Sequence, residues 1–363
     1  MPLAAASAAR VQLHAARLRS GVRSRASVRV AAVLADAPAP KSAPEVKAPA
    51  IDAKGFLEPE MQGVAQAIYD AGAEYGCFQL VNHGVSLDLI ARMQAAQRDF
   101  FALPLDTKAQ VKRSMSNPNG WFDDEYTKRT LDLKECFDFF NEKSVAAADP
   151  TVHRVIAARN QWPAGQPLFR DVMETYFGEM SRVSFKLLEA FCSALDIPLD
   201  SMHGLFDETH TSFMRLNFYP PQRPGERRMA LNHHTDAGFF TLLIQDPEVH
   251  GLQFHKHGQW NDVTPELDAI TVNVGDQCQV ISNDVFKAPV HRVLPPQSGR
   301  ARHSAPFFFN PKPDAMVQPH PAFVTPDRPP VYNAIPWAKF RNQRYAGDFA
   351  DEGEEVQIYH YKR

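Results

Sequence analysis

Hydrophobic residues recur at helical spacing in the first half of the chain. Residues three or four positions apart lie on one face of an α-helix, so this spacing predicts helices with one buried face. We expect such helices at residues 58–75, 87–103 and 168–195. The apolar stripe of the last and longest one predicts a helix packed across the back of a sheet.

From residue 211 the spacing of hydrophobic residues changes to two. Alternation of this kind predicts β-strands, because successive side chains of a strand point to opposite faces. Strands are predicted at residues 213–219, 239–245, 252–255, 269–274, 279–282, 290–294 and 303–310. A run of helices followed by many short strands favours an α+β fold, with a sandwich or jelly roll of strands and the helices packed outside it.

Two further stretches have less regular patterns. Residues 114–140 mix polar and aromatic side chains, which is typical of a lid or side wall over a pocket and equally of a plain surface loop. The C-terminal stretch from Trp337 onward predicts a closing helix with a solvated, acidic end.

The first 35 residues differ in composition from the rest of the chain. They contain six arginines and no acidic residue, which is typical of an organelle transit peptide; a disordered basic tail is the alternative. We expect import into a chloroplast, with a mitochondrial or cytoplasmic location as alternatives. Residues 36–50 are rich in proline and alanine and predict a linker. Residues 51–200 then form a helical N-terminal region, and residues 201–363 a strand-rich core with a C-terminal tail.

Charge and cysteine content exclude several classes of function. The net charge is −3, and removing the six positive charges of residues 1–35 leaves −9, so we expect no nucleic-acid partner. No apolar run approaches the roughly 20 residues of a membrane span, so no membrane partner is expected. The four cysteines lie far apart without a CxxC pair, which predicts reduced core thiols in an intracellular compartment. The oligomeric state is not determined by these features.

Three side chains suggest a metal site. His234 and Asp236 stand just before a predicted buried strand, and His291 lies at the start of a later one. Two histidines and one carboxylate are the ligand set of non-haem Fe(II) oxygenases. Residues i and i+2 share a strand face, so His234 and Asp236 are expected to reach one metal ion from one strand and His291 from another.

Two other interpretations of the histidines are open. The chain has 14 histidines, so a His-x-Asp sequence can arise by chance. His250, His255 and His257 cluster nearby and raise the alternative of zinc, but they lack paired cysteines and regular spacing.

Arg302 and Ser304 share one face of the last predicted strand. A guanidinium binds a carboxylate through two parallel hydrogen bonds, and a hydroxyl adds a third, so this pair suits the distal carboxylate of a dicarboxylate co-substrate. A strand-end salt bridge is the alternative. Asn217 and Tyr219 also share a strand face, and we expect them to hydrogen-bond the co-substrate carboxylate nearest the metal ion.

These residues stand within a longer series of motifs. The chain resembles the plant-type 2-oxoglutarate- and Fe(II)-dependent dioxygenase superfamily, which includes isopenicillin N synthase. The resemblance runs from about residue 76 to residue 358 and rests on His-Thr-Asp-x-Gly-x-x-Thr-Leu-Leu-x-Gln-Asp at residues 234–246, Gly-Leu-Gln at 251–253, Trp-x-x-Val-x-Pro at 260–265, Val-Asn-x-Gly-Asp at 272–276, Ser-Asn at 282–283, His-Arg-Val at 291–293, Arg-x-Ser at 302–304, Asn-x-Tyr-Pro at 217–220 and Phe-Gln-Leu-Val-Asn-His-Gly at 78–84.

The resemblance implies a double-stranded β-helix (jelly-roll) core flanked by α-helices, acting as one catalytic unit. It further implies Fe(II) as the metal, 2-oxoglutarate and O₂ as co-substrates, and ascorbate as an additional cofactor. The implied reaction releases succinate and CO₂ and hydroxylates or desaturates a small organic substrate.

The resemblance also places Arg215, Phe137 and Phe308 in the substrate pocket wall, and the aromatic residues suggest an apolar or planar substrate. Two alternatives remain open: an iron-dependent oxidase of the same fold that does not use 2-oxoglutarate, and a non-catalytic protein that binds a small molecule.

Overall fold

The computed structural model describes residues 47–57, 62–147, 158–297, 299–350 and 356–363. The predicted transit peptide and residues 36–46 of the predicted linker lie outside the described residues. The last linker residue, Ala50, already begins strand β1 (Ala50–Asp52), which pairs in parallel with β2 (Cys77–Val81).

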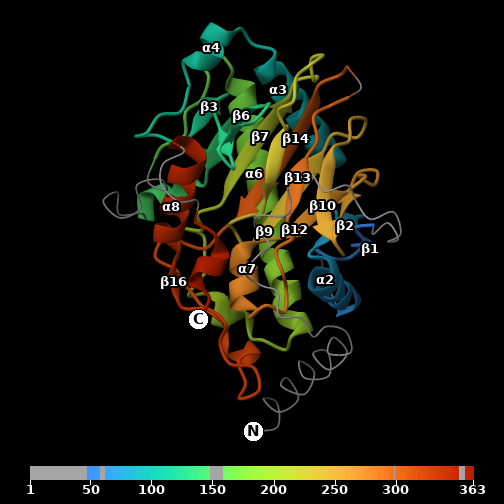
Figure 1. Ribbon diagram of the computed structural model, residues 1–363, viewed down its shortest axis with the longest axis vertical. Helices are drawn as coiled ribbons and strands as arrows, with labels where there is room; N and C mark the ends of the chain where they lie inside the picture. The colour runs from blue at the N-terminus through green and yellow to red at the C-terminus, as the bar shows by residue number, and fades with distance from the viewer. Residues whose placement is uncertain (1–46, 58–61, 148–157, 298, 351–355) are drawn as a thin grey trace.

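Two sheets form the centre of the molecule, and the smaller one lies in front of the larger one in Figure 1. The larger sheet has eight strands in the order β1-β2-β12-β9-β14-β7-β6-β3. The smaller sheet has the order β11-β10-β13-β8. The remaining strands of the two sheets are β3 (Gly120–Phe122), β6 (Glu135–Phe140), β7 (Phe213–Tyr219), β8 (Leu231–His234), β9 (Phe240–Gln245), β10 (Leu252–Lys256), β11 (Gln259–Asp262), β12 (Ile270–Val274), β13 (His291–Val293) and β14 (Arg302–Phe309).

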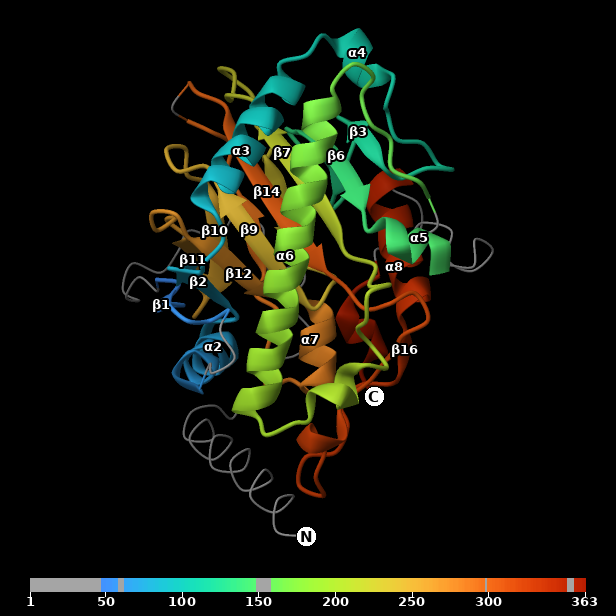
Figure 2. The same ribbon diagram turned by 180° about the vertical axis from the view of Figure 1, so that it is seen from behind.

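Long helices cover the outer face of the larger sheet. Helices α3 (Leu87–Phe101) and α6 (Pro167–Ala194) lie across it in Figure 2, and α2 (Gln62–Tyr75) packs against α6. The sequence of α6 presents buried apolar side chains at helical spacing, among them Met173, Met180 and Leu187. Burying each such side chain contributes roughly 1.5–3 kcal/mol. The main hydrophobic core therefore lies between the helices and the larger sheet.

The space between the two sheets is only partly filled. A smaller apolar cluster lies there, with Tyr219 and Leu243 from the larger sheet and Phe254 and Val293 from the smaller one. Helix α8 (Trp337–Ala350) lies beside the sandwich, and side chains from both sheets and from α8 line one cavity. The shorter elements are α4 (Leu105–Ala109), α5 (Glu142–Ala147), α7 (Asp276–Ile281), β4 (Tyr126–Thr127), β5 (Thr130–Leu131), β15 (Met316–Val317) and β16 (Ile335–Pro336).

The structure corrects one predicted element and decides the nature of another. Residues 279–282 were expected to be a strand, but residues 279–281 belong to helix α7. A run of only four residues, three of them buried, carries no periodicity that distinguishes a strand from a helix. Residues 114–140 contribute β3 and β6 to the larger sheet, and Asp138 and Phe140 of β6 line the cavity. This segment is therefore a side wall and not a plain surface loop.

All four cysteines are free and buried. Burial raises the pKa of Cys77 and of Cys136 to about 12, so these two thiols stay protonated at neutral pH. Within the described part of the chain, no helix has both the length and the apolar character needed to cross a membrane.

Candidate metal and co-substrate site

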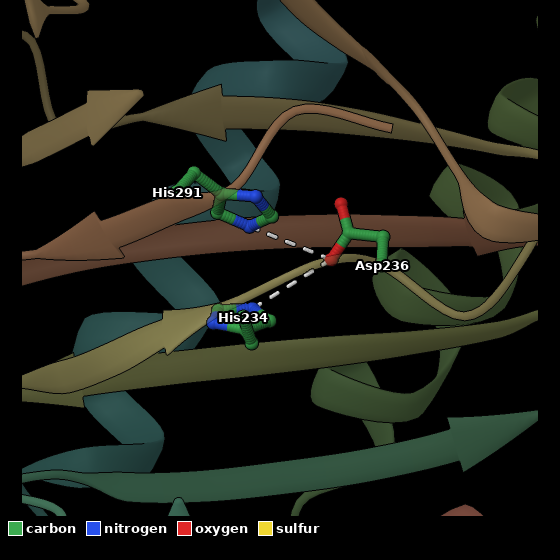
Figure 3. Close-up of side chains that lie close together, drawn as sticks. All are labelled: His234, Asp236 and His291. Carbon is green, nitrogen blue, oxygen red and sulfur yellow. Dashed lines mark ion pairs between the residues drawn. The ribbon is translucent and has the colours of Figure 1, made fainter. Parts of the chain in front are cut away.

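The two histidines of the predicted metal set come from neighbouring strands. His234 is the last residue of β8 and His291 the first residue of β13, and the antiparallel register pairs them directly. Their ring centroids lie 4.3 Å apart. Asp236 follows in the loop after β8, so it does not share a strand face with His234 as the spacing of two suggested. The loop instead brings its carboxylate back toward both rings (Figure 3).

The three side chains converge on one point. Asp236 Oδ1 lies 3.7 Å from His234 Nε2 and 3.5 Å from His291 Nε2. One ligand atom from each residue lies within 4.8 Å of the other two, and no other such group of three is found in the described ranges. His250, His255 and His257 form no comparable group there, and His255 packs edge-on against Trp260.

Backbone carbonyls determine which nitrogen of each ring is available to a metal ion. His234 Nδ1 lies 2.8 Å from the carbonyl oxygen of Asn232, and His291 Nδ1 lies 3.1 Å from that of Pro289. A carbonyl only accepts, so each Nδ1 carries a proton, and Nε2 is the nitrogen of each ring that is left to bind a metal ion. Burial, and then the neighbouring His291, hold the pKa of His234 well below its ordinary value. Two imidazoles that present Nε2 beside a carboxylate fit Fe(II).

Arg302 lies in the same cavity and is 1% exposed. Its Nε and Nη1 have no hydrogen-bond partner among the described residues, and Nη2 makes one long bond of 3.4 Å to Gln245 Oε1. Burial lowers the pKa of this guanidinium. A buried cation with unused donors is costly unless a ligand pairs with it, so this position fits a carboxylate of 2-oxoglutarate.

Strand register groups the other predicted co-substrate residues with Arg302. Tyr219 of β7 stands opposite Arg302, and Asn217 stands opposite Ser304. Asn217 Nδ2 donates to Ser304 Oγ at 3.3 Å, and its Oδ1 accepts from Cys136 Sγ at 3.2 Å. All four side chains line the cavity. The register places Tyr219 and Asn217 beside the pair expected to hold the distal carboxylate.

A second row of cavity-lining side chains crosses the sheet at the other end of these strands. Thr241, Phe308, Phe213 and Phe140 occupy registered positions on β9, β14, β7 and β6. Phe213 stacks on Phe308 at 4.5 Å and on Phe140 at 4.9 Å between centroids. The Arg341 guanidinium of α8 lies over Phe213, 4.9 Å from the ring centroid. The result is an apolar floor with a cation above it.

Phe137 does not belong to this floor, contrary to its expected place in the pocket wall. It is fully buried among aromatic side chains on the helix side of the sheet, including Phe100 and Phe169. Alternation along β6 turns Asp138 and Phe140 toward the cavity and Phe137 away from it.

Arg215 does line the cavity, but its guanidinium is already engaged. It donates to both carboxylate oxygens of Asp138 at 2.8 and 2.7 Å, and to Glu125 at 2.9 Å. Glu125 also pairs with Lys134 at 2.6 Å. Burial alone would raise the pKa of Glu125, but Arg215, Lys134 and Arg113 outweigh it and lower that pKa. A substrate therefore meets an ion pair here and not a bare arginine.

Three cavity residues of clear chemical interest were not predicted as site residues. Asn273 Nδ2 donates to Asp236 Oδ2 at 3.4 Å and so steadies the carboxylate. Thr241 Oγ faces the cavity without a hydrogen-bond partner among the described residues. Asn273 and Thr241 lie within quoted motifs, so the motifs contained a signal. Arg341 became recognisable only when the fold brought α8 to the cavity.

Comparison with known proteins gives this geometry a family. A family model described as the 2OG-Fe(II) oxygenase superfamily matches residues 210–311, and one described as the N-terminal region of non-haem dioxygenases in morphine synthesis matches residues 48–165. Jasmonate-induced oxygenase 4 of Arabidopsis thaliana is 32% identical over 76% of this chain and 76% of its own length. The chain belongs to the 2OG-Fe(II) oxygenase superfamily.

Solved structures agree with this membership. A structure of JOX2 in complex with 2OG, Fe and JA superposes with a TM-score of 0.70 at 28% identity, covering 82% of this chain and 85% of JOX2. A structure of a full-length Neurospora crassa protein in complex with alpha-KG and thymine superposes with a TM-score of 0.72 at 25% identity, covering 83% of this chain and 96% of that protein. The expected jelly-roll architecture and the expected use of Fe(II) and 2-oxoglutarate are thereby confirmed. The protein is an Fe(II)/2-oxoglutarate-dependent dioxygenase that hydroxylates or desaturates a small organic substrate.

Proposed function

We propose that the substrate is a small, largely apolar molecule that carries one carboxylate group, and that the reaction is its hydroxylation. The observation that carries this proposal is the stacked row of Phe308, Phe213 and Phe140, with the Arg341 guanidinium above it. The apolar body packs on the rings, and the acid group lies toward Arg341. The likeness to JOX2, whose structure contains JA, supports the same substrate class.

Each group of cavity residues has its own role, which depends on its position in the cavity. His234, Asp236 and His291 hold the metal ion, and Asn273 steadies the Asp236 carboxylate through its amide. Arg302 and Ser304 hold the far carboxylate of 2-oxoglutarate. When bound, Fe(II) with 2-oxoglutarate and O₂ supplies the oxidising chemistry: one oxygen atom goes to the substrate, and 2-oxoglutarate becomes succinate and CO₂.

Orientation and exclusion of water are the chain's own contribution. The two rows of side chains are set by strand register, so the co-substrate end at Arg302 and the phenyl row at Phe308 keep a fixed separation on β14. Phe213 and Phe140 remove water from the substrate end. The Thr241 hydroxyl lies in the phenyl row, where it is available to a polar group of the bound substrate.

The test compares acids with their own methyl esters. Anaerobically Fe(II)-loaded enzyme with 2-oxoglutarate is exposed to O₂ and to jasmonic, cinnamic or phenylacetic acid, or to the matching ester, and succinate is measured. We expect at least one acid to raise succinate release with one succinate per hydroxylated product, and its ester to be about tenfold less effective. The Arg341→Gln variant should lose most of this preference for the acid.

The possible outcomes separate this proposal from its alternatives. Stimulation by esters equal to that by acids would refute the proposed substrate class. Product without succinate would indicate an oxidase that does not use 2-oxoglutarate. Binding of an acid that is unchanged by iron removal, with no turnover, would indicate a non-catalytic binding protein.

We also propose a subcellular location, the chloroplast. The arginine-rich, acid-free first 35 residues support chloroplast import, with a mitochondrial or cytoplasmic location as alternatives. A fluorescent fusion to residues 1–50 should enter chloroplasts, and an unchanged distribution after deletion of residues 2–35 from the full chain would contradict this.

A further inference from the structure

The loop that carries Asp236 is held through its backbone. Each carbonyl oxygen from residue 235 to residue 239 accepts a hydrogen bond. Four of the donors belong to residues 275–277, at the start of α7: Gly275 N to Phe239 O at 2.9 Å, Asp276 N to Asp236 O at 2.8 Å, Gln277 N to Gly238 O at 2.9 Å, and Gln277 Nε2 to Ala237 O at 3.1 Å. The fifth carbonyl, that of Thr235, is held by a different part of the molecule.

Arg344 of α8 provides the fifth donor. Its Nη2 lies 3.0 Å from the carbonyl oxygen of Thr235, in the peptide that joins Thr235 to Asp236. Its Nη1 donates to the carbonyl oxygen of Val356 at 3.2 Å. The side chain is 5% exposed. A planar guanidinium with five donors can bond two carbonyls in fixed directions, which a lysine ammonium on a flexible stem does less well.

Helix α8 also borders the substrate cavity. Trp337, Arg341, Arg344 and Tyr345 all line it, at the helical spacing that places side chains on one face. The same face of one helix therefore touches the substrate end of the cavity and the metal-binding loop. Arg344 connects both to the C-terminal segment that begins at Val356.

We propose that Arg344 is a positioning residue that links the docking of α8 and the C-terminal segment to the placement of the Asp236 carboxylate. The Thr235 carbonyl belongs to the peptide plane immediately before Asp236, so rotation of that plane moves the carboxylate relative to His234 and His291. With Arg344 in place, metal binding and the docked position of α8 stabilise each other, because coupling between two sites is reciprocal. The inference rests on the metal site and is independent of the proposed substrate.

The first test measures metal affinity without turnover. Full-length apo protein is titrated with Co(II) against a chromogenic chelator, in the absence of O₂, 2-oxoglutarate and substrate. We expect Arg344→Gln to weaken Co(II) binding about 10- to 100-fold, the range typical for loss of a group that orients metal ligands. Lys339→Gln, which removes a charge from the exposed face of the same helix, should leave the affinity unchanged. Co(II) binding by Arg344→Gln within about twofold of the wild-type affinity would overturn the proposal.

The second test separates coupling from simple stabilisation. Hydrogen exchange of residues 337–350 and 356–361 is compared with and without saturating Co(II). Metal should slow exchange in the wild type and in Lys339→Gln, but not in Arg344→Gln. Equal metal-dependent protection in Arg344→Gln would refute the coupling.

A conservative variant keeps the proposal testable if Arg344→Gln does not fold. If Arg344→Gln gives no cooperative thermal transition, Arg344→Lys takes its place. Lysine retains the charge, but its ammonium is less able than a guanidinium to bond both carbonyls at once. The Co(II) affinity of Arg344→Lys should therefore lie between those of the wild type and Arg344→Gln, about three- to tenfold below the wild type. Wild-type affinity and wild-type metal-dependent protection in Arg344→Lys would overturn the role of the two-carbonyl bond.

Discussion

Replacing Arg302 by methionine should have opposite effects on the empty and on the co-substrate-bound protein. In the structure this guanidinium is 1% exposed, and two of its nitrogens lack a hydrogen-bond partner among the described residues. One long bond to Gln245 and the nearby Tyr219 ring offset part of the cost of burying this charge, and a paired carboxylate offsets much more. Methionine has a similar length and no charge to desolvate. The substitution therefore removes a penalty from the empty protein and an ion pair from the complex.

The two effects have estimable sizes. Replacing an incompletely paired buried charge by an apolar side chain is neutral or stabilises the fold by about 1–4 kcal/mol. Losing one partner of a buried, hydrogen-bonded charge pair costs about 2–5 kcal/mol of binding, which corresponds to a roughly 30- to 4000-fold weaker Kd for 2-oxoglutarate. Ser304→Ala removes a single hydrogen bond to a charged group, worth about 1.5–3 kcal/mol, and serves as a milder control.

Thermal unfolding of the Co(II)-loaded protein, with and without 2-oxoglutarate, measures both effects at once. We expect Arg302→Met to unfold at the same temperature as the wild type, or at a higher one, when 2-oxoglutarate is absent. A 2-oxoglutarate concentration that just saturates the wild type should raise the unfolding temperature of the wild type and raise that of Arg302→Met much less or not at all. If 2-oxoglutarate protects both proteins equally, the guanidinium does not hold the co-substrate.

Three further predictions concern other parts of the molecule. Burial lowers the pKa of His210 to about 4. The pKa of this histidine in the folded protein therefore lies below its value of about 6.5 in the unfolded chain. The contribution of neutral His210 to stability is present above pH 6.5 and is lost as the pH falls toward 4. Urea titrations at pH 7.5 and pH 4.5 should therefore show a larger drop in unfolding free energy for the wild type than for His210→Gln, by roughly 2–3 kcal/mol. Equal drops in the two proteins would contradict this. Phe308→Ala should raise the KM for the substrate about tenfold with little change in Tm. Phe137→Ala, in the core, should cost about 3–5 kcal/mol of unfolding free energy. The reverse pattern would mean that Phe137, and not Phe308, lines the cavity. Gly275→Ala should weaken Co(II) binding, because a Cβ at this position would lie 2.2 Å from the carbonyl oxygen of Gly238. As a control, Gly178→Ala on α6 has open space around it and should raise the unfolding free energy by about 0.5–1 kcal/mol.

Where a pattern extended over many residues, the sequence was a reliable guide to the fold. The expected helix at residues 168–195 corresponds to α6 (Pro167–Ala194), and the expected strand at 213–219 corresponds to β7. The strand expected at residues 279–282 was wrong because four residues are too few to show a period. The choice between a side wall and a surface loop for residues 114–140 stayed open because a polar residue that faces a cavity, such as Asp138, looks in the sequence like one that faces water.

In the candidate site, too, some features could be predicted from local sequence patterns and others could not. The ligand types could be proposed from motif resemblance, and the Arg302 and Ser304 pair also from local spacing, because residues two apart on one strand share a face. The loop position of Asp236, the neutralisation of Arg215 by Asp138 and the approach of α8 depend on contacts between distant segments. Those contacts leave no local pattern, so only the folded chain reveals them.

Anaerobic titration of full-length apo protein with Fe(II) measures whether His234, Asp236 and His291 share one ferrous ion. We expect one Fe(II) per chain, with equal affinity in the wild type and in His255→Ala, and no measurable binding in His234→Ala or His291→Ala. Wild-type Fe(II) binding in His234→Ala, or its loss in His255→Ala, would contradict this expectation.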